Sequence, residues 1–191
     1  MSNDKNKRIE ALRSRVRSKL AASKKTSRDL PEVNEEEVIT TLTATLTPVG
    51  GGTSIVLKTQ DLDGDGPDAP VVTVSGSLAA NTVYNGTMEI LNELESPAED
   101  ITEEIEEEAD EHQFFFGVTN SIVTATYADL DSNNLPIGLE YTITTSSPGS
   151  GTLTITLIHE PDKTATGVSG GDITNAGGST DITETFPITV E

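Results

Sequence analysis

The chain has 191 residues, a formal net charge of −20, no cysteine and no tryptophan. The lack of cysteine excludes disulfide bonds and thiolate metal sites. No stretch of the sequence approaches the roughly 18 apolar residues that a membrane-spanning helix needs.

The charge is divided unevenly along the chain. Ten of the twelve Lys and Arg residues lie within the first 28 positions, whereas the remainder holds thirty carboxylates against Lys58 and Lys163. The sequence therefore predicts a basic arm or leader at residues 1–30 and an acidic domain at residues 31–191. Because the acidic domain has so few cations, we do not expect it to bind nucleic acid.

Residues 5–28 have the pattern of a narrow amphipathic helix, with apolar side chains at helical spacing and cations around them. So thin an apolar stripe predicts a helix that is ordered by a partner, either a protein assembly or an anionic surface. An expression-derived leader is the alternative interpretation. We find no apolar stretch typical of a secretory signal. The apolar residues of the stripe are Ile9, Leu12, Val16 and Leu20.

From Glu37 onward the pattern alternates with period two, which predicts strands that bury one face. In the first strand Val38, Leu42, Ala44 and Leu46 are expected to face the core. The abundance of Thr, Val, Ile and Gly and the regular turn signals predict a mainly β fold, an antiparallel Ig-like β-sandwich of about eight or nine strands. Further strands are predicted at Ser54–Gln60, Val71–Leu78, Val83–Leu91, Gln113–Val118, Ile122–Ala128, Leu139–Thr145, Thr152–His159 and Ile182–Val190.

Two segments depart from the simple pattern of strands: one could be a turn, and the other is predicted to be a helix. The pair Asn85–Gly86 is typical of a hairpin turn, so the strand around it is either continuous or ends there. The sequence Ser96-Pro97-Ala98-Glu99 predicts a capping box at the start of one helix, with Ile101, Ile105 and Ala109 on its buried face and an almost wholly acidic outer face.

The segment Asp61-Leu62-Asp63-Gly64-Asp65-Gly66 is the strongest motif. It places carboxylates at positions 1, 3 and 5 of a tight loop and glycine at position 6, the arrangement that converges oxygens on calcium. Asp68 or a backbone carbonyl would complete the shell, and an Asp/Gly-rich turn is the alternative. The predicted ligands are Asp61, Asp63, Asp65 and Asp68.

A second loop has nearly parallel spacing. Asp129, Asp131 and Asn133 occupy positions 1, 3 and 5, Asn134 can adopt the left-handed conformation at position 6, and Glu140 falls at position 12. The spacing predicts a second calcium loop between strands, with an ordinary hairpin loop as the alternative.

The remaining chemical candidates are weaker. His112 follows two acidic residues and is a candidate for a transition-metal site, while His159 stands beside Glu160; a structural role is the more frequent one for such histidines. Gly167-Val168-Ser169-Gly170-Gly171 matches the string of a nucleophile elbow but lacks the strand and helix around it, so we expect a flexible loop. We therefore predict no catalytic residues and no enzyme.

Three segments together resemble a family of small surface lipoproteins of Gram-negative bacteria, encoded beside TonB-dependent outer-membrane transporters and labelled as type 1 periplasmic-binding-like. The resemblance covers about residues 35–191 and implies an extracytoplasmic or cell-surface location. This sequence departs from the family at the front, where it has a basic, cysteine-free segment. The segments that carry the resemblance are residues 61–66, 96–116 and 149–157.

These observations predict a non-enzymatic, calcium-stabilised recognition or display module, attached to a larger assembly or a cell surface through residues 1–28. One alternative is an accessory lipoprotein that captures a metal or another ligand for an outer-membrane transporter. The other is a decoration or spike subunit of a virion, docked by its N-terminal arm.

Overall fold

The computed structural model describes residues 38–63 and 69–191. These residues belong to the second of two units into which the chain divides after Glu35. The predicted basic helix at residues 5–28 lies outside the described residues.

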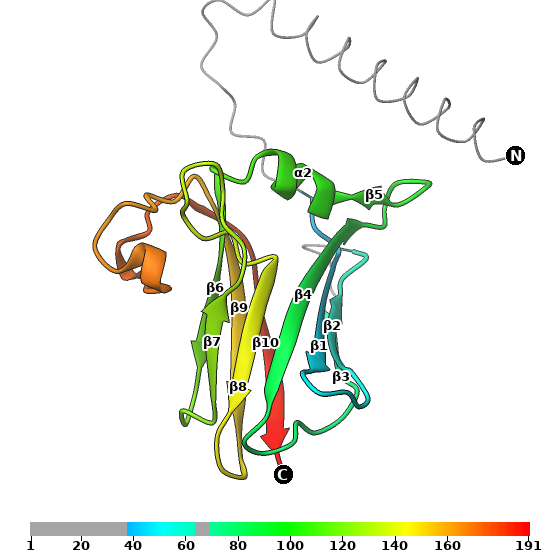
Figure 1. The fold of residues 1–191 in the computed structure, drawn as a ribbon. Helices are drawn as coiled ribbons and strands as arrows, with labels where there is room; N and C mark the ends of the chain where they lie inside the picture. The colour runs from blue at the N-terminus through cyan, green and yellow to red at the C-terminus, as the bar shows by residue number, and fades with distance from the viewer. Residues whose placement is uncertain (1–37, 64–68) are drawn as a thin grey trace, which may run out of the picture. The chain divides into compact units, whose positions relative to one another are not determined.

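Ten strands of the described residues form two antiparallel sheets (Figure 1). The larger sheet has the order β3 (Val71–Val74), β2 (Ile55–Gln60), β1 (Thr41–Pro48), β4 (Val83–Asn92), β8 (Glu140–Thr145), β7 (Val123–Tyr127), with β5 (Glu99–Asp100) paired to β4. The smaller sheet has the order β10 (Ser179–Val190), β9 (Gly149–His159), β6 (His112–Val118).

The two sheets form a β-sandwich because each contributes its apolar face to one core. The larger sheet contributes Leu42, Leu57 and Ile90, and the smaller sheet contributes Phe114 and Ile155, all of them fully buried. Burying one such side chain stabilises the fold by about 1.5–3 kcal/mol. The prediction of a mainly β, antiparallel sandwich is confirmed.

Each predicted strand overlaps a strand of the structure, with corrections at particular residues. Val38 is 55% exposed and precedes β1, so its predicted place in the core is wrong. The strand β4 continues through Asn85–Gly86 without a turn. Glycine is required there for packing, since a Cβ atom at Gly86 would overlap the ring of Tyr141 on β8.

The predicted helix is present but begins later than expected. It is α2 (Ile101–Glu107), and its N-cap is Asp100, whose side chain accepts a hydrogen bond from the Thr102 N–H. The predicted capping box at Ser96 is wrong because β5 pairs with the end of β4 and delays the helix. Ile101 and Ile105 are buried as expected.

The segment between β9 and β10 covers the outer face of the smaller sheet. It carries two short 3-10 helices, η1 (Val168–Gly170) and η2 (Ile173–Asn175). Val168 packs in a small second core with Phe115 of β6 and Ile158 of β9. The predicted flexible loop at residues 167–171 is therefore a folded turn with a buried anchor.

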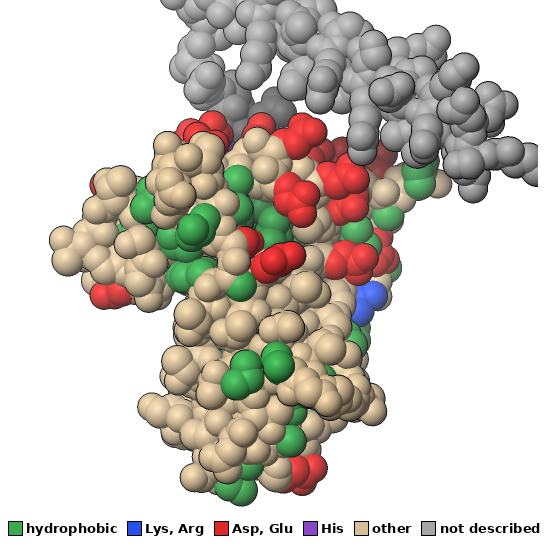
Figure 2. Space-filling model, viewed as in Figure 1, with side chains coloured by type: hydrophobic (Ala, Val, Ile, Leu, Met, Phe, Trp, Pro, Cys, Tyr) green, Lys and Arg blue, Asp and Glu red, His purple; other side chains and the backbone are tan. Residues whose placement is uncertain are grey.

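Acidic side chains gather at one end of the domain, around α2 and β5 (Figure 2). The exposed glutamates of α2 are Glu103, Glu104, Glu106 and Glu107.

Candidate functional site

An open cleft of about 730 Å³ lies between β6 and β7. Each of these strands is the last strand of its sheet, so the cleft lies along one edge of the sandwich. The lining residues are Phe116, Val118, Ser121, Val123, Thr124, Ala125, Thr126, Tyr127, Leu130, Asn134, Leu135, Pro136, Ser169, Gly170 and Gly171.

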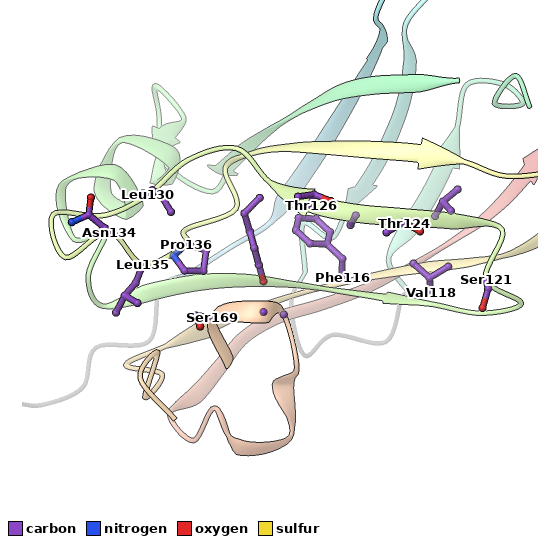
Figure 3. Close-up of a pocket in the computed structure, with 15 residues that line it drawn as sticks. Phe116, Val118, Ser121, Thr124, Thr126, Leu130, Asn134, Leu135, Pro136 and Ser169 are labelled. Carbon is purple, nitrogen blue, oxygen red and sulfur yellow. The ribbon is translucent and has the colours of Figure 1, made fainter. Parts of the chain in front are cut away.

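Figure 3 shows how these side chains are arranged along the cleft. Phe116 and Val118 lie on β6, and Thr124 and Thr126 lie on β7, so the two strands form its long sides. Ser121 marks the closed end at the turn between the strands. The opposite end is formed by the loop that follows β7 and by η1.

The cleft exists because β6 and β7 are joined by a tight turn and yet do not pair with each other. Asn120 and Ser121 have φ values of 59° and 50°, the positive values that a two-residue hairpin turn requires. However, β6 pairs with β9, and β7 pairs with β8. At the turn itself the Thr119 N–H donates to the Thr152 carbonyl of β9. The strands therefore follow different sheets from the turn onward.

The backbone of β6 has polar groups on the cleft side. In an antiparallel ladder the N–H and C=O of one residue point to the same side, and the next residue points to the other. The Phe114 N–H donates to the Ile137 carbonyl, on the side away from β9. The N–H and C=O groups of Phe116 and Val118 therefore also point away from β9. Among the described residues, no backbone group pairs with those of Phe116 and Val118 on this side.

The backbone of β7 has the same property. The Ala128 N–H donates to the Glu140 carbonyl, and the Ile122 carbonyl accepts from the Ser146 N–H. The backbone N–H and C=O groups of the even-numbered residues of this strand therefore face β8. Val123 and Ala125 consequently direct their N–H and C=O groups toward the free edge. No partner for them occurs within residues 38–63 and 69–191. Two sheet edges with unpaired groups thus face one cleft.

Tyr127 fixes the inner end of the cleft. Its hydroxyl donates to the Phe114 carbonyl at 2.6 Å and accepts a hydrogen bond from Gln113 Nε2 at 3.0 Å. Gln113 also donates to the Val168 carbonyl at 2.9 Å, which ties η1 to both sheets. Burial raises the pKa of Tyr127, the Gln113 hydrogen bond opposes this rise, and the charge of Asp129 adds to it.

The lining of the cleft is suited to a neutral, partly apolar ligand. None of the described residues that line it carries a formal charge, and Tyr127 is its one titratable side chain. Leu130 is 58% exposed at its mouth, and Phe116 and Val118 are half-buried. The arrangement offers shape, apolar contacts and backbone hydrogen bonds.

The second predicted calcium loop uses its carboxylates to shape itself. Asp129 accepts backbone hydrogen bonds from Gly138 and Glu140, both at 2.8 Å. Asn134 has the predicted left-handed conformation, with φ of 61°.

Asp131 lies at the centre of this loop and is bound to a buried lysine. Its Oδ1 accepts from the Asn133 and Leu135 N–H groups, and its Oδ2 accepts from Lys163 Nζ at 2.9 Å. Lys163 is 3% exposed and also donates to the Ala109 carbonyl at 2.6 Å. Burial alone would raise the pKa of Asp131, but the hydrogen bonds from Leu135, Lys163 and Asn133 lower it below its ordinary value.

The structure does not bring the carboxylates of this loop together. In the part of the chain that the structure describes, the converging group of acidic and histidine side chains does not include Asp129, Asp131 or Glu140. An ammonium group already compensates Asp131. These residues therefore have an evident structural role, and calcium binding there stays a prediction.

The first predicted calcium loop is described in part. Asp61 and Asp63 line a small pocket of about 250 Å³, and the Asp63 N–H donates to Asp61 Oδ1 at 3.2 Å. Asp65 and Asp68 lie outside the described residues. Burial raises the pKa of Glu184 on β10, a Thr59 hydrogen bond opposes the rise, and the charge of Asp61 adds to it. The structure thus adds a carboxylate near this loop that the sequence did not indicate.

The two histidines lie next to each other, although 47 positions separate them in the sequence. His112 and His159 are register partners on β6 and β9, and their rings stack at 4.8 Å between centroids. His112 is fully buried, with Nδ1 at 3.1 Å from the Glu108 carbonyl. The candidate transition-metal residue is therefore enclosed, and His159 Nε2 lies 3.8 Å from Glu111 Oε2.

The cleft was missed by sequence reasoning. Its residues belong to segments that the sequence assigned to ordinary strands and loops, and the sequence does not show which strands are edges. The tight turn at Asn120–Ser121 is of the kind that normally closes a hairpin. Ser169 and Gly170, which the sequence assigned to a loop, also line the cleft.

Comparison of the chain with protein-family models, with curated proteins and with solved structures found no match. Within the described residues, no helix is both long enough and apolar enough to cross a membrane.

Proposed function

We propose that this protein is a non-enzymatic recognition module that binds an extended, uncharged segment of another polypeptide in the cleft between β6 and β7. The single observation that carries the proposal is the pair of unpaired strand edges facing this cleft. A β-strand is the ligand whose own backbone repeats at the spacing of those edges.

The chemistry of the lining defines the segment. Half-buried Phe116 and Val118 offer apolar contacts, and Thr124 and Thr126 offer hydroxyl groups. Because no charged side chain lines the cleft, a charged ligand residue inside it would lose hydration without gaining a partner. The favoured segment therefore alternates apolar residues with Thr, Ser or other uncharged residues.

The surroundings support a binding role. The Tyr127 hydroxyl, the one titratable group of the lining, is occupied by Gln113 and the Phe114 carbonyl. Those bonds hold both sheets at fixed positions around the cleft, and a rigid site loses less entropy on binding. The proposal also includes attachment to an assembly or surface through residues 1–28. It further includes stabilisation by calcium at the aspartate loops.

A selection of linear peptides against the full chain tests the proposal. We expect the enriched peptides to be uncharged and alternating. Val118→Lys should weaken their binding by about tenfold or more, because an edge lysine blocks strand addition. Thr144→Lys on the exposed face of β8 is the matched control and should bind as the wild type does.

Peptide chemistry supplies a second test that needs no protein variant. A peptide that adds to one of the two edges directs only every second N–H toward that edge. Methylating its backbone nitrogen at successive positions should therefore abolish binding at alternate positions. If every methylated peptide binds as tightly as its parent, or Val118→Lys has no effect, strand addition in this cleft is excluded.

A further inference from the structure

A second group of side chains, away from the cleft lining, converges where β9 ends and β6 begins. Glu111 precedes β6, His159 is the last residue of β9, and Glu160 follows it. The ligand atoms of these three side chains all lie within 4.8 Å of one another. His159 and Glu160 are adjacent in the sequence, and the pairing of β6 with β9 brings Glu111 close to them.

The backbone holds the two carboxylate-bearing residues together. The Glu160 N–H donates to the Glu111 carbonyl at 2.6 Å. Glu160 has a φ of 52°, the left-handed conformation, so the chain turns sharply directly after β9. The two side chains leave from neighbouring, hydrogen-bonded backbone positions and are both exposed.

The imidazole of His159 is oriented by burial and stacking. His159 is 9% exposed, and its ring lies nearly parallel to the fully buried ring of His112, with 9° between the planes. Its Nδ1 is buried and has no hydrogen-bond partner among the described residues. Its Nε2 lies 3.8 Å from Glu111 Oε2, which is longer than a hydrogen bond. The imidazole is thus held in place, and a ring nitrogen lies within 4.8 Å of an oxygen of each of the two exposed carboxylates.

Among the described residues, no lysine or arginine compensates the local charge. The lysines of the acidic domain are Lys58 and Lys163. Lys58 contacts Glu93, and Lys163 contacts Asp131 and the Ala109 carbonyl. Neither lysine is therefore the counter-ion of Glu111 or Glu160.

We propose that Glu111, His159 and Glu160 bind one divalent transition-metal cation of the zinc class. One imidazole nitrogen with two carboxylate oxygens is a donor set that such ions accept, whereas calcium and magnesium prefer oxygen alone. Two carboxylates balance the charge of the ion, and three protein ligands leave a coordination position for water or for a donor from a partner. The ion would join the end of β9 to the start of β6.

Zinc titration of the full chain by calorimetry tests this site, with excess calcium present throughout to occupy oxygen-only sites. We expect one zinc ion to bind the wild type. Glu160→Gln should weaken zinc binding by at least about tenfold, because it removes a ligand from an exposed position. Glu103→Gln on the exposed face of α2 makes the same charge change away from the cluster and should leave the affinity unchanged.

Cobalt absorption provides a readout of the ligands themselves. Bound Co²⁺ should give visible bands in the wild type and in Glu103→Gln, and these bands should be lost in Glu160→Gln and in Glu111→Gln. Equal zinc affinity in wild type and Glu160→Gln would overturn the proposal, as would the absence of zinc binding in the presence of calcium.

Discussion

The two ends of β7 differ in how completely their polar groups are paired. At the Tyr127 end, the tyrosine hydroxyl, Gln113 and the carboxylate of Asp131 all have hydrogen-bond partners. At the other end, Val123 and Ala125 direct backbone groups toward the cleft that have no partner in the described part of the chain. The domain thus combines one hydrogen-bonded region with an open edge beside it. The comparison suggests that the bonded end exists to hold the open end in position.

The largest effect is expected at the buried ion pair. Lys163→Met should lower the free energy of unfolding by about 3–5 kcal/mol, because it leaves the buried Asp131 carboxylate without its ammonium partner. Denaturant unfolding measures this loss. The matched control is Lys58→Met, whose partly exposed pair with Glu93 is 3.9 Å long and should contribute about 0–1 kcal/mol. Equal losses in the two variants would remove the special role of the buried pair.

Two tyrosines provide the next test. Tyr127→Phe should destabilise the fold by about 1–3 kcal/mol, since Gln113 and the Phe114 carbonyl each lose a buried partner. Tyr141→Phe is the control: its buried hydroxyl has no hydrogen-bond partner within the described residues, so removing it should be neutral or stabilising. Urea unfolding of both variants checks the prediction, and a costly Tyr141→Phe would contradict it.

The pH dependence of stability should be traceable to Asp131. Hydrogen bonds lower the pKa of this group in the folded state, so its contribution is fully present above the unfolded pKa of 3.8. The contribution is lost as the pH falls through the lower, folded value. Unfolding free energies measured across the acid range should fall less steeply for Asp131→Asn than for the wild type. Parallel curves for the two proteins would show that another group controls acid unfolding.

Calcium should distinguish the two aspartate loops, with an effect of a few degrees on the melting temperature. If calcium binds the first loop of the folded protein, millimolar calcium raises the melting temperature by mass action. Asp61→Asn should abolish this shift, whereas Asp129→Asn should lower the melting temperature and keep the shift. A wild type that melts identically in calcium and in chelator contradicts the calcium prediction.

These loops also show how far the sequence can be used. Period-two alternation predicted every strand except β5, because burial of one face leaves a local pattern that needs no knowledge of the partners. The spacing of Asp129, Asp131 and Asn133 matched a calcium loop, but the role of the Asp131 carboxylate depends on Lys163, which lies about thirty positions away. Long-range contacts of this kind decide the chemistry and leave no local pattern.

The cleft was beyond prediction for a related reason. A strand on a free edge and a strand within a sheet have similar sequences. They differ in that the edge strand lacks a paired strand on one side. The turn at Asn120–Ser121 normally closes a hairpin, but competing pairing with β8 and β9 separates its strands. The proposed metal site left a clearer signal in the sequence, since each of the two histidines stands beside a glutamate.

Backbone hydrogen exchange of the edge residues tests the recognition cleft most directly. The Phe116, Val118 and Ala125 amides should exchange rapidly in the free protein, because they have no partner within residues 38–63 and 69–191. They should exchange slowly once a selected peptide is bound. We expect protection at residues of one edge and in alternation along that strand. Rapid exchange at all three positions in the peptide complex would contradict the account, as would slow exchange there in the free protein.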